Sequence, residues 1–300
     1  MASTSLKQYE TRKNIFQTDG WKRFRKNKLA VIGLIIILAL VLIAIFAPVV
    51  AHNDPYKSLT NTHGMMLKDK SPEKSGTILG TDNIGRDVFS RLVYGARVSL
   101  SVGLVAVGIS VALGILLGAL AGYFGGVIDN IIMRIVDIVY CFPTMFLCII
   151  IAAIVGPSIF NIMAIIGLTN WTGVARLVRG EILRVRETEY VQAAVSLGAR
   201  HSRVILSHII PNILAPIIVE ATLEMARAIL TECALSYLGV GVQMPTASWG
   251  NMLMNANNLA TLTLRWWQWV PAGLCILLSV LSINFIGDGL RDALDARQKK

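Results

Sequence analysis

The sequence contains few charged residues for its length. Only 15% of its 300 residues are Asp, Glu, Lys or Arg, while 54% are hydrophobic and the mean hydropathy is +0.62. An average soluble domain carries about 25% charged residues. This composition excludes an ordinary soluble globular domain.

Motifs for catalysis and metal binding are also absent. No G-x-x-x-x-G-K-[ST] run occurs, so the chain has no P-loop of its own for ATP, and there is no G-x-S-x-G or H-E-x-x-H run. The four histidines match no metal-ligand spacing; they are His52, His63, His201 and His208. We therefore expect no catalytic residue, no metal site and no cofactor, and we do not expect the protein to be an enzyme.

Cysteine is scarce, with only four residues, Cys141, Cys148, Cys233 and Cys275. All four lie in apolar stretches, where a free thiol behaves as a small hydrophobic group. None forms a C-x-x-C pair or lies in a polar segment where a disulfide would persist. We therefore do not expect disulfides to hold the fold together.

Long apolar runs are what the sequence has instead. A helix needs about 20 apolar residues to cross the hydrocarbon core of a bilayer. Six stretches meet this requirement: 29–51, 97–123, 131–155, 158–178, 213–240 and 268–287. They predict an all-α polytopic membrane protein with six transmembrane helices. The first run is too long for a signal-peptide core and lacks a small-residue cleavage site, so we expect a retained anchor.

The distribution of Lys and Arg predicts the orientation. Residues 1–28 carry eight Lys or Arg against two acids, and residues 176–211 carry six Arg against three acids. Residues 241–267 have one Arg and no acid, and 52–96 are nearly balanced, with six basic and five acidic residues. Both chain ends and the loop 176–211 are therefore expected in the cytoplasm. The net charge of +10 is interpreted as a topology signal rather than a nucleic-acid site.

This orientation divides the chain into five parts. They are a cytoplasmic basic tail at 1–28, an anchor at 29–51, an extracytoplasmic segment at 52–96, a transmembrane core at 97–288 with a cytoplasmic loop at 180–211, and a cytoplasmic tail at 289–300.

The cytoplasmic loop contains a short amphipathic pattern. Tyr190, Ala193, Ala194 and Leu197 recur at helical spacing and predict one apolar stripe of a helix. Gly198 should end that helix, because glycine readily adopts the left-handed conformation required there.

A second short helix is predicted over 202–210. Val204, Ile205 and Ile209 would share one side of it, with Ser202 as its cap. Pro211 either ends this helix or opens the next span as a first-turn proline. The residues alone leave two interpretations of the loop: a docking element for an acidic protein partner, or an amphipathic helix lying on anionic lipid head groups.

The spacing of these residues resembles the EAA loop of ABC-transporter inner-membrane permeases. That loop reads E-A-A-x3-G-x9-I-x-L-P, and the chain matches it at Ala193, Ala194, Gly198 and Pro211. In that family the loop docks into the ATPase subunits. The resemblance therefore implies an ATPase-coupling loop formed by Tyr190, Gln192, Ala193, Ala194, Leu197, Gly198, Arg200 and Pro211.

Three positions of the loop depart from the family pattern. Gln192 stands in place of glutamate, His208 in place of isoleucine and Ile210 in place of leucine. Glutamine keeps a hydrogen-bonding side chain of similar shape, so docking should survive. A salt bridge from position 192 to the ATPase is not expected.

Further segments resemble the C-type permease of dipeptide and oligopeptide importers over residues 22–300. These segments read LGTDNIGRDVFSRL and YGAR before the second span, AGYFGG and GPS in the core, and LGVG, WG and GDGLRD toward the end. The resemblance implies a type I ABC importer permease fold in the bacterial inner membrane.

The same resemblance implies the partners and the function. We expect a second permease subunit, two cytoplasmic ATPases that hydrolyse the ATP, and an extracytoplasmic peptide-binding protein, with uptake of dipeptides or oligopeptides. Related permeases for nickel, glutathione or antimicrobial peptides share these motifs and remain the alternative. A non-ABC channel is the other rival, but it would have no use for a coupling loop.

Charged residues inside the apolar stretches indicate function or pairing, because each costs about 2.5–3.5 kcal/mol on insertion scales. Glu220, Glu224 and Arg227 form one polar stripe at i, i+4 and i+7. They either line the translocation pore and contact the charge of the peptide, or form an internal Glu224–Arg227 pair that is buried at the subunit interface. Arg134 and Asp137 are three residues apart and are predicted to pair with each other.

Two further patterns concern packing and the outer surface. Gly114, Gly118, Gly122 and Gly126 form a ridge that allows close helix approach, either within the chain or to a partner permease. In the outer segments, Asp82 is predicted to cap the helix of the second span. Trp249, Trp266, Trp267 and Trp269 are predicted to anchor in the head-group region, and 243–251 to contact the binding protein.

Overall fold

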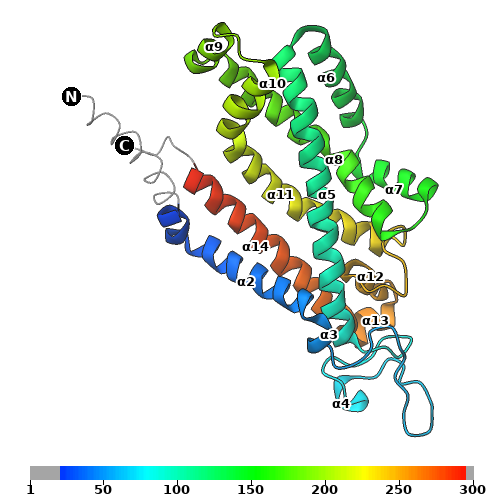
Figure 1. Cartoon of the computed structure of the whole chain (residues 1–300). Helices are drawn as coiled ribbons and strands as arrows, with labels where there is room; N and C mark the ends of the chain where they lie inside the picture. Colours follow the sequence, from blue (N-terminus) through cyan, green and yellow to red (C-terminus); the bar gives the residue numbers. More distant parts are fainter. Residues whose placement is uncertain (1–20, 295–300) are drawn as a thin grey trace.

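The computed structural model describes residues 21–294, and every regular element in that range is a helix. This confirms the predicted all-α fold (Figure 1). The long helices are α2 (Lys28–Ile45), α5 (Val88–Phe124), α6 (Gly126–Tyr140), α7 (Thr144–Val155), α8 (Ile159–Arg186), α11 (Ile210–Tyr237) and α14 (Val270–Leu294). The short elements are α3 (Ala47–Val50), α4 (Pro72–Ser75), α9 (Glu189–Ser196), α10 (His201–Arg203), η1 (Val204–Ile209), α12 (Trp249–Leu253), η2 (Met254–Asn257), α13 (Leu259–Leu264) and η3 (Trp266–Gln268).

Within the described range, four helices are long and apolar enough to cross a membrane: α2, α5, the continuous stretch His201–Tyr237, and α14. A fifth is counted if α6 and α7 form one broken span, but they are bent by 88° at their junction. The predicted count of six is therefore not confirmed. The predicted run 131–155 is interrupted where α6 ends before Pro143, because the ring of proline does not fit a continuing helix.

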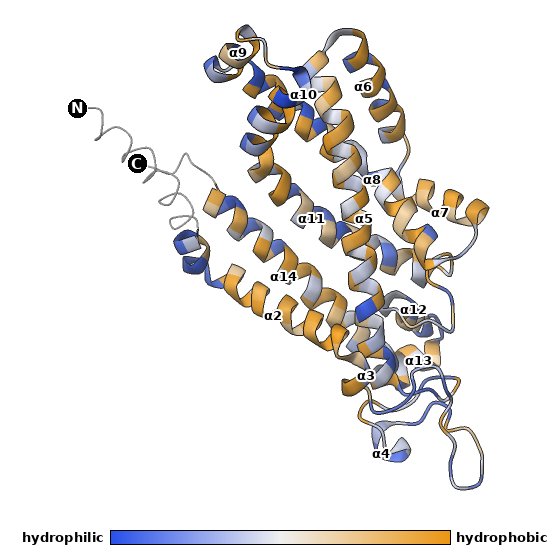
Figure 2. Ribbon diagram, in the orientation of Figure 1, coloured by the Kyte–Doolittle hydropathy of each residue, from blue (hydrophilic) through white to orange (hydrophobic). Residues whose placement is uncertain are grey.

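Helix α2 is apolar on nearly all its faces (Figure 2). Only Ala30, Gly33 and Ala44 of this helix are buried, and the helix packs against α14 and α5. Asn27 caps its beginning by accepting a hydrogen bond from the Ala30 N–H at 3.2 Å. A helix with exposed Ile and Leu over most of its length fits a lipid environment, as expected of the predicted anchor.

Helices α5 and α8 form the main contact of the fold. A Cβ atom at Gly114 would lie 2.5 Å from Val174 Cβ, and one at Gly118 would lie 2.6 Å from the Ala175 carbonyl oxygen. The predicted glycine ridge therefore packs within the chain, which is one of its two interpretations. Gly126 is not part of the ridge, since α5 ends at Phe124 and a Cβ atom at Gly126 would meet nothing within 4 Å.

The outer cap, which we define as residues 52–87 and 239–269, closes the end of the bundle opposite α9 (Figure 1). The predicted role of Asp82 as a helix cap is wrong. Asp87 caps α5 and accepts from the Phe89 N–H at 3.2 Å, while buried Asp82 binds Arg86 Nε at 2.8 Å and lies 3.7 Å from Arg91 Nε. Asp82 lies too early in the sequence to reach the first turn of α5, which begins at Val88.

The predicted head-group position of the tryptophans is also wrong for two of them. Trp249 is fully buried and donates to the Leu92 carbonyl at 3.1 Å, and Trp267 is buried and donates to the Thr81 carbonyl at 3.3 Å. Trp266 is exposed and Trp269 is half-buried, and a head-group position for these two stays a prediction. Each indole N–H of the buried pair binds a carbonyl, which allows these rings to pack inside the outer cap.

Candidate functional sites: the elbow and the polar cavity

The elbow, defined as residues 187–209, joins α8 to the stretch that becomes α11. Helix α9 ends at Ser196, and Gly198 follows with φ of +78°, as the sequence predicts. A Cβ atom at Gly198 would meet nothing within 4 Å, so glycine is favoured there by its backbone conformation alone.

The predicted apolar stripe of α9 points away from the body of the chain. Leu197 is 88% exposed, Tyr190 is 45% exposed and Ala193 is exposed, whereas Ala194 is partly covered. The residue that holds α9 in place is Val191, which is 2% exposed and packs in a core with Val204 and other residues. Sequence reasoning missed Val191, because it lies outside the i, i+3, i+4 pattern that defines the stripe.

The second half of the elbow differs from the separate helix predicted over 202–210. Helix α10 covers only His201–Arg203, with Arg200 rather than Ser202 at the N-cap position and no side-chain cap. It continues as the π-helix η1, in which the Ile210 N–H binds the Ile205 carbonyl. Pro211 follows in the first turn of α11, which confirms one of its two predicted positions. A proline ring clashes with the carbonyl four residues earlier, and the wider π turn gives it room.

Polar contacts attach the elbow to α5. The ring Nδ1 of His201 lies 2.9 Å from the Tyr123 hydroxyl, and both rings pack against Phe124. Directly before the elbow, at the end of α8, Arg186 Nη1 donates to the Gly122 carbonyl at 3.1 Å. The elbow therefore has a firm attachment on one side and exposed apolar side chains on the other. The sequence contains no local signal for these contacts, since they join residues 64 and 78 positions apart.

The structure brings the predicted polar stripe of α11 together in one cluster. Arg227 donates to Glu224 Oε2 from Nε at 3.0 Å and from Nη2 at 2.8 Å, and it also forms an ion pair with Glu220. The Glu224–Arg227 pair, one part of the two interpretations of this stripe, forms within the chain.

The cluster lines a cavity of about 260 Å³, which we call the polar cavity. Its lining comes from the α6–α7 junction, α8 and α11, and consists of Val139, Tyr140, Thr144, Thr169, Asn170, Thr172, Gly173, Glu220, Glu224 and Arg227. A partly enclosed space with hydroxyl, amide and carboxylate groups can bind a small polar or charged group.

The predicted pair of Arg134 with Asp137 is wrong. Asp137 instead binds Arg176 of α8 at 3.0 Å, and the Arg176 guanidinium lies 4.3 Å from the ring centroid of Tyr140. Helix α8 packs beside α6 and supplies a guanidinium that the spacing within α6 could not indicate.

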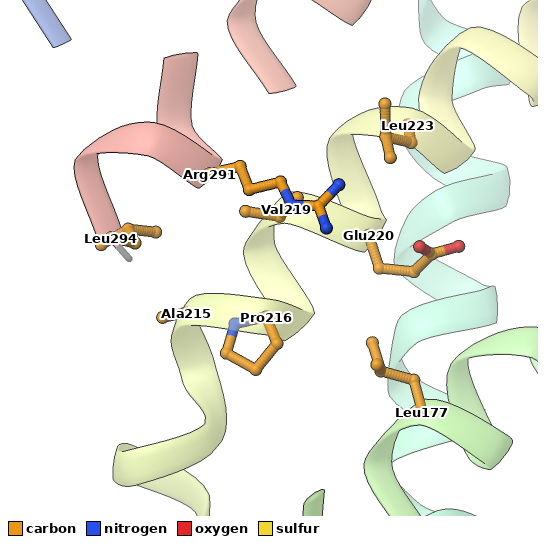
Figure 3. A pocket seen from close by; sticks show the side chains of 8 residues that line it. All are labelled: Leu177, Ala215, Pro216, Val219, Glu220, Leu223, Arg291 and Leu294. Carbon is orange, nitrogen blue, oxygen red and sulfur yellow. The ribbon is translucent and has the colours of Figure 1, made fainter. Parts of the chain in front are cut away.

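A second cavity of about 360 Å³ lies between α11 and α14 (Figure 3). Arg291 reaches into it from α14 toward α11, and its other walls are mostly apolar. Glu220 lines both cavities, and in Figure 3 its carboxylate points away from α14. Glu220 thus lies on α11 between the two spaces.

Known proteins match the chain over nearly its whole length. The family described as "Binding-protein-dependent transport system inner membrane component" matches residues 114–300, and "N-terminal TM domain of oligopeptide transport permease C" matches residues 17–69. The dipeptide transport system permease protein of Escherichia coli is 45% identical over 94% of this chain and 93% of its own length. The oligopeptide transport system permease protein of Bacillus subtilis is 41% identical over 94% of this chain and 90% of its own length.

Proposed function

The chain belongs to the family of binding-protein-dependent transport system inner membrane components, and on that premise we propose that it forms half of the membrane pathway of an ATP-driven importer of dipeptides and oligopeptides. The relatives named above are permeases for dipeptides and oligopeptides, which favours a peptide over nickel or glutathione. The chain is a multi-pass protein of the inner membrane. ATP would be hydrolysed by separate subunits, since the sequence contains no P-loop.

The observation that carries this proposal is the exposed apolar face of the elbow. Tyr190, Val195 and Leu197 project from a short helix and its end, while Val191 and the π-helix fasten the same helix to the core. Exposed apolar side chains on an element that is itself anchored to the core are suited to contact with a partner protein. We propose that an ATPase subunit covers this face, and that Gln192, Ala193, Ala194 and Arg200 lie in or beside the contact.

The remaining parts of the proposal follow from this assignment. The elbow and both chain ends lie in the cytoplasm, and the outer cap faces the peptide-binding protein. A second, related permease completes the pathway, and two ATPases drive it. When the ATPases close on ATP, they would pull the two elbows together. The attachment of the elbow to α5 and α11 would then pass the movement to the polar cavity, where Glu220, Glu224 and Arg227 line the pathway.

Cysteine crosslinking tests this function. A Leu197→Cys chain, expressed with its neighbouring transport subunits, should form a crosslink to an ATPase subunit. Val49→Cys is the matched control, because Val49 is similarly exposed but lies in α3, beside the outer cap. Crosslinks from Leu197→Cys to phospholipid alone, or purification of the chain without any ATPase, would contradict the proposal.

A further inference from the structure

A fully buried carboxyl group lies near the outer end of α11. The carboxyl of Glu232 accepts from the Ser99 hydroxyl of α5 at 2.9 Å on Oε2, and from the Ser236 hydroxyl of α11 at 2.8 Å on Oε1. Glu232 forms no ion pair with any residue in 21–294. An enclosed carboxyl group without a cation is costly, so its presence in a membrane helix indicates a role beyond packing.

Each of the two serines also binds the outer cap. The Ser236 hydroxyl oxygen accepts from the Val242 N–H at 2.9 Å, and the Ser99 hydroxyl oxygen accepts from the Trp249 N–H at 3.2 Å. Each hydroxyl therefore accepts from the outer cap and donates to Glu232, which makes the carboxyl group the common end of two hydrogen-bond chains. Between the two attachments, residues 243–245 are exposed, and we call them the outer tip.

The loop that carries the outer tip is packed tightly. A Cβ atom at Gly250 would lie 2.6 Å from Cys233 Cα, so the loop rests directly on α11. The side chain of Asn251 closes the loop on itself, because it donates to the Thr246 carbonyl at 2.6 Å and accepts from the Ser248 N–H at 3.1 Å. Packed interiors have no spare volume. A displacement of the outer tip would therefore move the two serines and Glu232 with it.

The two helices that meet at Glu232 both lead to the elbow. Helix α5 carries Ser99 toward its outer end and Tyr123 at its inner end, where the Tyr123 hydroxyl lies 2.9 Å from His201 Nδ1. Helix α11 carries Glu232 toward its outer end and Pro211 in its first turn, directly after the π-helix of the elbow. Glu232 thus ties α5 to α11 at one end, and the elbow is joined to both helices at the other.

We propose that Glu232 is a positioning residue that passes a displacement of the outer tip, made when the peptide-binding protein docks, to α5 and α11 and so to the elbow. This inference rests on the proposed function of the chain as the permease of a binding-protein-dependent importer. Glu232 touches neither peptide nor ATP in this proposal. A carboxylate suits the role because it accepts at both oxygens, whereas an amide of the same shape has one oxygen and one NH₂ group.

ATP hydrolysis by the complete transporter tests the proposal. Both permease subunits and the ATPases are assembled in nanodiscs and titrated with binding protein loaded with dialanine. In Glu232→Gln the NH₂ group faces one serine hydroxyl, which can no longer donate to position 232. We expect the maximal stimulation of ATP hydrolysis to fall about tenfold, the effect of losing one hydrogen bond to a charged group.

The concentration of binding protein that gives half-maximal stimulation distinguishes this role from a structural one. It should change by less than about twofold in Glu232→Gln, because the Trp249 indole and the Asn251 side chain still hold the loop. ATP hydrolysis without binding protein should also stay the same.

Two serines of α5 provide a matched pair of variants. Ser99→Ala removes one of the two chains, whereas Ser110→Ala removes a similarly buried hydroxyl that has no hydrogen bond to the described residues. Ser99→Ala should lower the maximal stimulation, and Ser110→Ala should leave it unchanged. If Glu232→Gln does not assemble, the comparison of these two variants decides the proposal by itself.

The outcomes separate this role from the function of the chain. Equal maximal stimulation in the Ser99→Ala and Ser110→Ala transporters overturns the proposal. A higher half-maximal concentration with normal maximal stimulation also overturns it, because Glu232 would then only shape the docking surface. A proportional fall in basal and stimulated hydrolysis overturns it as well, since that indicates a structural role. If the unchanged chain retains no ATPases, or no binding protein stimulates them, the proposed function fails instead.

Discussion

The elbow and the outer cap are both irregular segments that join long helices. They differ in how much of each segment is buried and bonded to the rest of the chain. In the outer cap, buried Asp82 accepts from two backbone N–H groups and from Arg86, and the Trp267 indole binds a carbonyl. In the elbow, Val191 is the buried residue of α9, and Leu197 is almost fully exposed. The outer cap thus encloses a buried charged group together with its partners, although Gln268 Oε1 and Trp269 Nε1 are buried there without a hydrogen bond to residues 21–294, whereas α9 contributes only Val191 to the core.

This difference teaches how to recognise a contact surface in a membrane subunit. Exposed apolar side chains on α2 are expected, because lipid surrounds that helix. Helix α9 is short, polar at other positions and joined to α8 by a turn, so its exposed apolar side chains fit the protein contact that we propose for the elbow. Substitutions should therefore affect stability in the outer cap and coupling in the elbow.

The largest effect is expected for Asp82→Ala in the outer cap. The change leaves the buried guanidinium groups of Arg86 and Arg91 without their carboxylate, which costs about 3–5 kcal/mol. The stability of the folded chain should fall strongly, as measured by the melting temperature of the purified transporter. Asp54→Ala is the control, because Asp54 is an exposed residue paired with Lys57, and it should leave the melting temperature unchanged. Similar melting temperatures for the two variants would contradict the view that Asp82 and its arginine partners hold the outer cap together.

The next effect compares two glycines with the same φ of +78°, Gly80 in the outer cap and Gly198 in the elbow. Alanine is strained at both, by about 1 kcal/mol. At Gly80 its Cβ would also lie 2.5 Å from the Lys70 carbonyl oxygen and 2.9 Å from the Trp267 ring, which adds roughly 1–3 kcal/mol. Gly80→Ala should therefore lower the melting temperature more than Gly198→Ala.

In the same pair, Gly198→Ala should reduce peptide uptake per folded transporter, because it changes the direction of α9 rather than the packing of the core. Uptake normalised to the amount of assembled complex measures this. If Gly198→Ala lowered the melting temperature but left uptake normal, Gly198 would serve stability rather than coupling, contrary to this prediction.

A third prediction concerns Leu197 itself. Leu197→Ser removes an exposed apolar side chain, so the melting temperature of the isolated chain should stay the same. Binding of the ATPase subunits should weaken roughly tenfold, which is about 1.4 kcal/mol. Titration of ATPase into permease-containing nanodiscs measures the affinity. Leu259→Ser, at an exposed position in the outer cap, is the control that should bind ATPase normally.

The smallest effect is expected for Tyr123→Phe. This change removes the hydrogen bond to His201 but keeps both ring contacts, so it should cost about 0.5–1.5 kcal/mol. Hydrogen exchange of the elbow amides should increase, while that of the outer cap should not. Unchanged exchange in residues 187–209 would show that this contact does not hold the elbow.

Much of the fold follows from local chemistry that can be read in the sequence. Four of the six apolar runs coincide with helices long and apolar enough to cross a membrane, since a helix satisfies its own backbone groups where lipid offers no water. Gly198 and Pro211 have the predicted conformations, because the positive φ and the missing N–H are properties of the residues themselves. The break after α9 is therefore predictable, whereas the sequence left open whether Pro211 ends the second short helix or begins α11.

Other features depended on which helices become neighbours. Asp137 binds Arg176 of α8 rather than Arg134, and Trp249 is buried rather than at the lipid surface. In both cases the contacts come from residues that are distant in the sequence but close in the fold. Spacing along one helix cannot report such contacts. It also could not show that α6 and α7 bend by 88° instead of forming one straight span.

The sequence by itself determined that this is a helical membrane protein with a glycine-jointed loop and a polar stripe at 220, 224 and 227. Only the tertiary structure decided that the apolar stripe of α9 faces outward while Val191 faces inward, and that serines of α5 and α11 both donate to Glu232. Periodicity reports which residues share a side of a helix. The packing of the other helices decides which side is covered and which remains free to bind.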